Sequence, residues 1–221
     1  MKKSEVVTLT VGEHNVPSSA SVVNLGANFD CHLNMSKFVD KKVSVCLFYL
    51  KSIGKIRKYL DSNATKALVQ AFVLSRLDYC NSLLYGCCKS SLYKLQLVQN
   101  QAARLISYVH KWDHITPVLR SLHWLPIVYR IQFKILVLVH NCLNGRAPYY
   151  LYIMLKQKVS RRCLRSSKSS LLAQKLVKSN SGCRAFVNSG PYLWNSLPEN
   201  FKNVSATYDF KCQLKTYMFC C

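Results

Sequence analysis

Acidic side chains are scarce in this sequence. Only nine of its 221 residues are Asp or Glu, against 31 Lys and Arg, so the formal net charge is +22 at pH 7 and the pI is near 9.7. A surplus of this size repels itself in a folded chain and attracts polyanions. The composition therefore favours a nucleic acid as the partner, with an anionic membrane surface as the second candidate and a purely solubilising role as the third.

The few carboxylates are also dispersed. Nucleotidyl transfer with two metal ions needs carboxylates that converge on paired cations, commonly with an adjacent acidic pair among them. No two acids are adjacent here, and the sequence lacks both a G-x-S-x-G nucleophile motif and a glycine-rich phosphate loop. We therefore predict no catalytic residue and no cofactor in this chain.

Metal-ligand spacing is equally weak. His110 and His114 have a ligand-like separation, but Cys87 and Cys88 are adjacent where a zinc site needs two intervening residues. We predict no metal site. The eleven cysteines show no disulfide framework, so we expect free thiols and small core residues.

Long apolar runs are missing too. The best candidate, residues 135–139, is flanked by Lys134 and His140 and falls far short of the roughly 18 residues that cross a bilayer. The amino terminus has no apolar signal segment. We expect a protein that is neither secreted nor membrane-bound and that resides in the nucleus or the cytoplasm.

What the chain does contain is periodic hydrophobicity. Residues 1–30 alternate apolar and polar side chains, which predicts two strands joined by a loop. From Ser36 onward the period is helical, so the fold is predicted to be mainly α with a small amino-terminal β element and a mixed, loop-rich carboxyl-terminal part. Ser62 and Thr116 are the expected caps of two helices. Near the end of the chain we predict a short strand at 184–187, then a helical turn and a final helix at 206–219.

The segment 112–145 is expected to organise the fold. Pro126 forces Leu125 out of the helical conformation, so a stiff bend should join a short helix to a long one. Apolar residues at three- and four-residue intervals predict a buried stripe on the long helix: Val128, Ile131, Ile135, Leu138, Val139 and Cys142. On the opposite face, Arg130 and Lys134 are predicted to form a basic strip toward solvent.

A basic face is also predicted on the first helix. At about 100° per residue, five lysines fall within a stripe that has Phe48 in its midst: Lys37, Lys41, Lys51, Lys55 and Lys58. Such a row can follow a phosphate backbone while the aromatic ring stacks on a base or sugar. The alternative is an ordinary solvated helix face, with Phe48 belonging to a neighbouring core.

Further candidate contacts to nucleic acid lie outside this row. Arg57 is adjacent to it in sequence, and a basic loop at 156–181 contains no acid. Three arginines of that loop are included as candidates: Arg161, Arg162 and Arg165.

Several motifs resemble one protein family. The strings L-Y-K-L-Q-L-V-Q-N-Q-A-A-R-L-I (92–106), D-H-I-T-P-V-L-R-S-L-H-W-L-P (113–126), G-C-R-A-F (182–186), L-W-N-S-L-P (193–198) and F-K-C-Q-L-K-T (210–216) are similar to the carboxyl end of reverse transcriptases of non-LTR (LINE) retrotransposons, in the Jockey-like group. The string V-V-N-L-G-A-N-F-D (22–30) resembles the last strand region of the polymerase palm. The resemblance covers almost the whole chain.

The resemblance implies a fragment of an RNA-directed DNA polymerase. Residues 1–30 would be the palm edge, 31–110 a helical thumb-like domain, and 111–221 a carboxyl-terminal extension. The catalytic aspartate pair, which binds Mg²⁺ in the parent family, would precede this chain. We therefore expect a non-enzymatic protein that binds RNA or an RNA/DNA template-primer, and the missing palm and fingers are its implied partners.

Two other interpretations remain open. The chain is alternatively a stand-alone interaction or scaffold protein derived from a transposon, or a reading frame that yields no stable protein. Activity as an enzyme would require catalytic acids from another chain.

Overall fold

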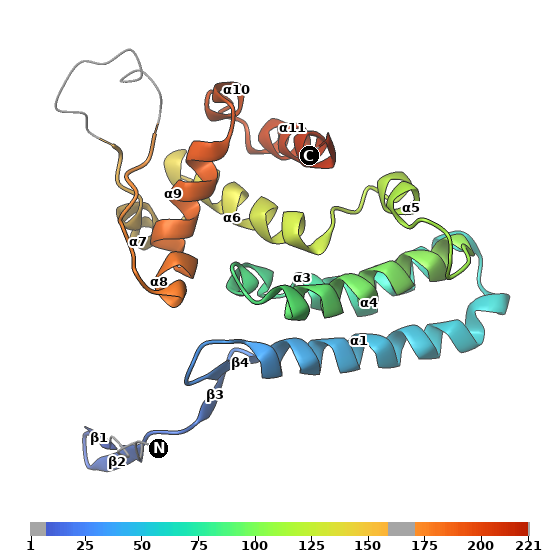
Figure 1. Cartoon of the computed structure of the whole chain (residues 1–221), viewed down its shortest axis with the longest axis horizontal. Helices are drawn as coiled ribbons and strands as arrows, with labels where there is room; N and C mark the ends of the chain where they lie inside the picture. Colours follow the sequence, from blue (N-terminus) through green and yellow to red (C-terminus); the bar gives the residue numbers. More distant parts are fainter. Residues whose placement is uncertain (1–7, 159–170, 221) are drawn as a thin grey trace.

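The computed structural model describes residues 8–158 and 171–220. This part of the chain is mainly helical, with a small β region at its amino-terminal end and a loop-rich carboxyl-terminal part, so the predicted fold class is confirmed (Figure 1). The longer helices form two layers, one above the other in Figure 1.

The first layer contains two long helices, α1 (Ser36–Ile56) and α4 (Lys89–Ser107), which pack side by side. The chain returns from the end of α1 to the start of α4 through η1 (Arg57–Tyr59), α2 (Ser62–Val69), the π-helical η2 (Gln70–Leu74), α3 (Ser75–Asp78) and η3 (Asn81–Leu84). Val39, Cys46 and Ile53 recur at helical spacing on α1 and are buried. The apolar periodicity of α1 therefore sets which of its faces packs inward.

Three helices form the second layer: α6 (Ile127–Leu143), α9 (Phe186–Ser196) and α11 (Thr207–Cys220). His140 of α6 lies fully buried at the centre of this layer. Its ring stacks on Phe210, with 4.1 Å between the ring centroids, and its Nε2 hydrogen-bonds to the Val204 carbonyl at 2.7 Å. This polar contact lets an imidazole occupy an otherwise apolar core.

The corner before α6 is held by α4. The Gln96 side-chain oxygen accepts the Ile127 backbone N–H at 2.8 Å, and the Gln99 side-chain amide donates to the Leu125 carbonyl at 2.9 Å. Gln99 and Trp124 are both buried. Two glutamines of the first layer therefore satisfy the backbone at the point where the second layer begins.

Arg184 links the carboxyl-terminal part of the chain to the segments before α1 and α4. Its guanidinium donates to the carbonyls of Tyr85, Leu33 and Leu83, at 2.9, 2.6 and 3.3 Å, and to the Cys87 sulfur at 3.0 Å. The carbonyl acceptors belong to the segment before α1 and to the segment before α4. One side chain thus ties the carboxyl-terminal part to the first layer.

The remaining elements are short. Two antiparallel hairpins, β1 (Thr8–Val11) with β2 (His14–Pro17) and β3 (Ser21–Asn24) with β4 (Ala27–Asp30), precede α1. The short helices are α5 (Thr116–Ser121), α7 (Tyr149–Met154), α8 (Asn180–Arg184) and α10 (Glu199–Lys202). Over the residues that the structure describes, no helix has the length and apolarity needed to span a membrane.

Four local predictions were wrong. The strand predicted at 184–187 is helical, because α8 and α9 meet there. Asp61, and not Ser62, caps α2, since its carboxylate accepts the Ala64 N–H at 2.7 Å. Thr116 lies inside α5 and makes no side-chain cap. Val128, predicted in the buried stripe of α6, is 45% exposed.

Two β-strands were predicted over residues 1–30, and the described part of this range, residues 8–30, contains four. The segment interpreted as a loop contains β2, because Gly12 adopts a positive φ of 61° and allows a tight hairpin there.

Replacing Gln99 with Leu tests how much the corner depends on α4. The Leu125 carbonyl would lose its donor in a buried position, so we expect the free energy of unfolding to fall by about 1–3 kcal/mol in urea denaturation. Gln101→Leu is the matched control, because Gln101 is an exposed glutamine of the same helix and its loss should cost less than about 0.5 kcal/mol. Equal stabilities of the two variants would contradict the role of Gln99.

Candidate nucleic-acid interface

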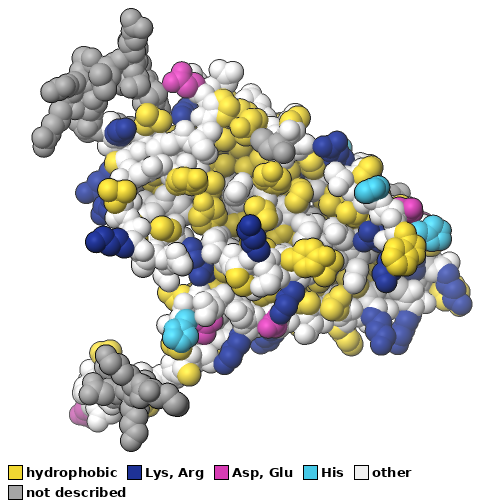
Figure 2. Space-filling model, in the orientation of Figure 1, with side chains coloured by type: hydrophobic (Ala, Val, Ile, Leu, Met, Phe, Trp, Pro, Cys, Tyr) yellow, Lys and Arg dark blue, Asp and Glu magenta, His cyan; other side chains and the backbone are white. Residues whose placement is uncertain are grey.

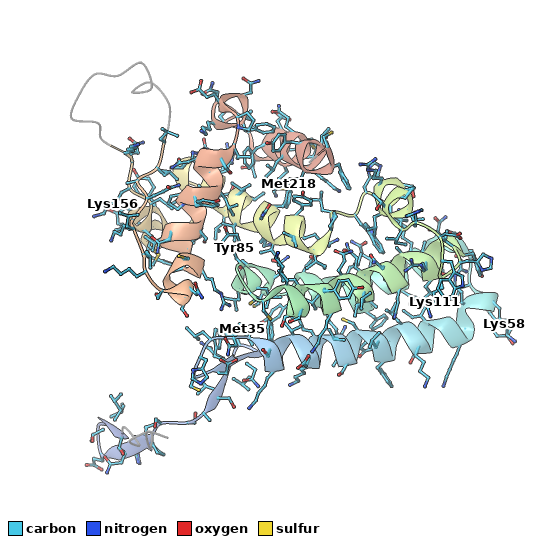
Figure 3. The ribbon with its side chains drawn as sticks, viewed as in Figure 1. Met35, Lys58, Tyr85, Lys111, Lys156 and Met218 are labelled. Atoms are coloured by element: carbon cyan, nitrogen blue, oxygen red, sulfur yellow. The ribbon has the colours of Figure 1, made fainter. Side chains whose placement is uncertain are left out.

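The predicted lysine row is exposed along its length. We call the five residues Lys37, Lys41, Lys51, Lys55 and Lys58 the lysine face. Lys and Arg side chains line the lower edge of the molecule in Figure 2, where α1 lies, and Lys58 marks the far end of this edge in Figure 3. At ~1.5 Å rise per residue the face is about 30 Å long, which matches roughly nine nucleotides of one strand at ~3.4 Å each.

The one acid of α1 does not neutralise this face. The Asp40 carboxylate accepts a hydrogen bond from the Lys94 ammonium of α4, with 2.7 Å between the nitrogen and the oxygen. The pair is exposed, so it adds little stability, but it leaves the five lysines without a carboxylate of their own helix. The face is thus more strongly positive than its sequence neighbourhood indicates.

Phe48 belongs to an exposed aromatic group rather than to a core. It is 66% exposed and meets Tyr49 edge to face, with ring centroids 5.5 Å apart. Tyr49 in turn stacks on Phe72 at 5.2 Å and carries the Arg76 guanidinium 4.4 Å from its ring centroid. Phe48 therefore presents a free aromatic surface beside the lysines, as stacking on a base requires.

Arg57 is not part of the interface, which corrects its prediction as a nucleic-acid contact. It is 5% exposed, and its guanidinium donates to the carbonyls of Leu105, Leu60 and Ile106 at 2.9, 2.8 and 3.1 Å. The Tyr108 ring covers it, with 4.0 Å to the ring centroid. A guanidinium held in this way cannot reach a phosphate. Instead, it joins the end of α1 to the end of α4.

Of the two basic residues predicted to face solvent on α6, Lys134 does so and Arg130 does not. Arg130 donates two hydrogen bonds to Asp78, one of them at 2.9 Å, and its side chain is only 17% exposed. Lys134 is exposed but lines a cavity with Arg130, away from α1. The contact with Asp78 of α3 therefore accounts for the low exposure of Arg130.

Lys42, next to Lys41 of the lysine face, is buried, and its burial lowers its pKa. It is 8% exposed, its ammonium donates to the Tyr79 carbonyl, and it lies 4.5 Å from the Phe38 ring centroid. Burial lowers the pKa of Lys42 from 10.5 to about 8, against a smaller opposing influence of Cys80, Cys46 and Asp78. Its place three residues after Val39 and four before Cys46 was a sequence signal for this burial.

Three predicted contacts, Arg161, Arg162 and Arg165, lie outside the described residues. Within residues 8–158 and 171–220, no group of three or more His, Cys, Asp or Glu side chains is placed to hold a metal ion.

The chain matches no family model, no curated protein and no solved structure. Its function is therefore inferred from its own residues.

The structural role of Arg57 is tested by replacing it with Met. Three backbone carbonyls would lose their donor, so we expect a loss of about 2–4 kcal/mol in the free energy of unfolding, measured by urea denaturation. Lys58→Met, next in sequence and exposed, should change stability by less than about 0.5 kcal/mol. An Arg57→Met variant as stable as the control would return Arg57 to the list of ligand contacts.

Lys42 predicts a pH dependence of stability. Its folded pKa of about 8 lies below the ordinary 10.5, so the unfolded chain holds more protons between these values and the free energy of unfolding rises with pH across that window. Compared with a Lys42→Met variant, the wild type should gain on the order of 2 kcal/mol between pH 8 and pH 10. Parallel pH profiles for the two proteins would show that the pKa of Lys42 is not lowered in the folded protein.

Proposed function

We propose that this chain is a non-catalytic protein that binds nucleic acid through the lysine face of α1. The observation that carries the proposal is the row of five exposed lysines whose only helical carboxylate, Asp40, is engaged by Lys94. Rows of ammonium groups bind the phosphate backbone and release its counterions, which is the main source of affinity that does not depend on base sequence.

The particular protein that we propose is a fragment of a reverse transcriptase of a non-LTR retrotransposon. The motif resemblance described above supports this origin, and the all-helical first layer fits the thumb-like domain that the resemblance implies. In this proposal RNA or an RNA/DNA hybrid is the ligand, and the Mg²⁺-binding carboxylates belong to the missing palm. The fragment retains binding and has no polymerase activity.

The chemistry of the face favours contact with the nucleic-acid backbone over recognition of base edges. Lysine is a flexible point charge with no fixed hydrogen-bond geometry, unlike arginine, which recognises bases and phosphates with two parallel bonds. Backbone binding with one stacking side chain, Phe48, therefore fits grip along a duplex or single strand and not base-specific recognition.

Charge reversal tests the proposal. The variant Lys37→Glu, Lys51→Glu, Lys55→Glu should bind an RNA/DNA hybrid at least about tenfold more weakly, and the slope of log K against log salt should fall in magnitude by about three. Fluorescence anisotropy with a labelled hybrid over a salt series measures both quantities.

The matched control carries the same change in net charge elsewhere. Arg120, Lys202 and Lys211 lie outside α1 and outside the basic loop 156–181, so their triple replacement with Glu should keep the wild-type salt slope. Equal losses in the two variants would mean that net charge alone drives binding, and the assignment to α1 would be wrong.

A further inference from the structure

A cavity of about 410 Å³ lies where the two helical layers meet. Its walls come from α2, η2, α3 and η3 of the first layer, from the corner before α6, and from α6 and α11. Its volume is within the range of small-ligand sites, roughly 300–1,000 Å³. No residue of α1 lines it, so it is separate from the lysine face.

The charge around this cavity is strongly positive. Lys66 of α2, Lys134 of α6 and Lys215 of α11 line it together with Arg130 and Asp78. Arg130 and Asp78 neutralise each other through two hydrogen bonds. Within the described part of the chain, the three lysines form no ion pair.

Three lysines from three separate helices, none of them ion-paired within the described residues, thus line one concavity. Like charges gathered in a cleft raise its potential and attract an anion, because the surrounding protein has a lower dielectric than water. A compact anion with more than one negative charge, such as a phosphate monoester, matches this arrangement.

The rest of the wall includes aromatic rings and one unsatisfied acceptor. His123 and Phe133 line the cavity, and Asn81, which is 6% exposed, is also part of its lining. The Asn81 Oδ1 accepts no hydrogen bond from the described residues, while its amide nitrogen makes only a long contact of 3.4 Å to Asp78. Buried side-chain acceptors normally have a donor.

We propose that this cavity binds a nucleoside phosphate. In this arrangement the phosphate lies among Lys66, Lys134 and Lys215. The base packs against His123 and Phe133, and one of its N–H groups donates a hydrogen bond to the Asn81 Oδ1. A nucleobase combines a planar face with N–H donors, which neither inorganic phosphate nor an aliphatic anion does. The ligand is either a free nucleotide or the phosphorylated end of a strand.

The first experiment is an NMR titration of the full chain with adenosine 5′-monophosphate, with adenosine and with inorganic phosphate. The nucleotide should bind saturably, shift the amide signals of His123 and Lys134, and bind at least about tenfold more tightly than either of its parts. Absence of saturable binding, or phosphate binding as tightly as the nucleotide, would overturn the proposal.

Two variants locate the site. Lys134→Glu should weaken nucleotide binding by at least about tenfold, whereas Lys156→Glu, an exposed lysine away from the cavity, should leave it unchanged. Both variants replace an exposed lysine with glutamate, so an effect of the charge change on folding would be seen in both and would not be mistaken for loss of binding. Unchanged binding in Lys134→Glu would remove the cavity as the site.

Competition separates the two sources of the ligand. A short single strand with a 5′-phosphate should displace the nucleotide if the cavity holds strand ends, and the same strand with a 5′-hydroxyl should not. If neither strand displaces it, the cavity takes free nucleotides.

The site stands apart from the proposed function of α1. The triple variant of Lys37, Lys51 and Lys55 should keep full nucleotide affinity, so a failure of hybrid binding and a failure of the cavity are measured independently.

Discussion

Two hydrogen bonds from glutamine side chains of α4 hold the corner on which the arrangement of the two layers depends. The corner exposes backbone groups because Pro126 interrupts the helical pattern, and the buried Leu125 carbonyl would otherwise lack a donor. Gln96 and Gln99 supply the missing partners at 2.8 and 2.9 Å. The same corner contributes His123, Trp124 and Leu125 to the lining of the cavity.

Some of the basic side chains hold the fold together, and others remain exposed to a ligand. The arginines Arg57, Arg130 and Arg184 are turned inward or paired, on backbone carbonyls or on Asp78. A planar guanidinium with five donors can satisfy several carbonyls at once, and it is desolvated more cheaply than an ammonium. The lysines of α1 stay at the surface, with the exception of Lys42. The basic composition therefore overstates the charge that a ligand can reach.

Much of the helical framework was predictable from apolar spacing, and the failures have identifiable causes. The long helices α1, α4, α6 and α11 follow from repeats of three and four residues, because an apolar stripe must be buried wherever the helix packs. The prediction for Val128 was wrong because this residue lies in the first turn of α6, where it is 45% exposed, although Ile131 and Val139 of the same stripe are buried. The strand prediction at 184–187 was wrong because a short apolar run does not distinguish a strand from a helix. Gln99 is polar and yet buried on α4, and only its contact with the Leu125 carbonyl, 26 residues away, explains this burial.

Helical geometry alone placed the lysine face, because all five lysines lie on α1 or the η1 turn that follows it, and their angular positions follow from 3.6 residues per turn. Tertiary structure alone decided which basic residues remain free. Asp40 is neutralised by Lys94, 54 residues away, and Arg57 is enclosed by the end of α4. The cavity lysines belong to three helices that are brought together only by packing of the layers. Such contacts depend on how whole helices meet, and no local pattern in the chain encodes them.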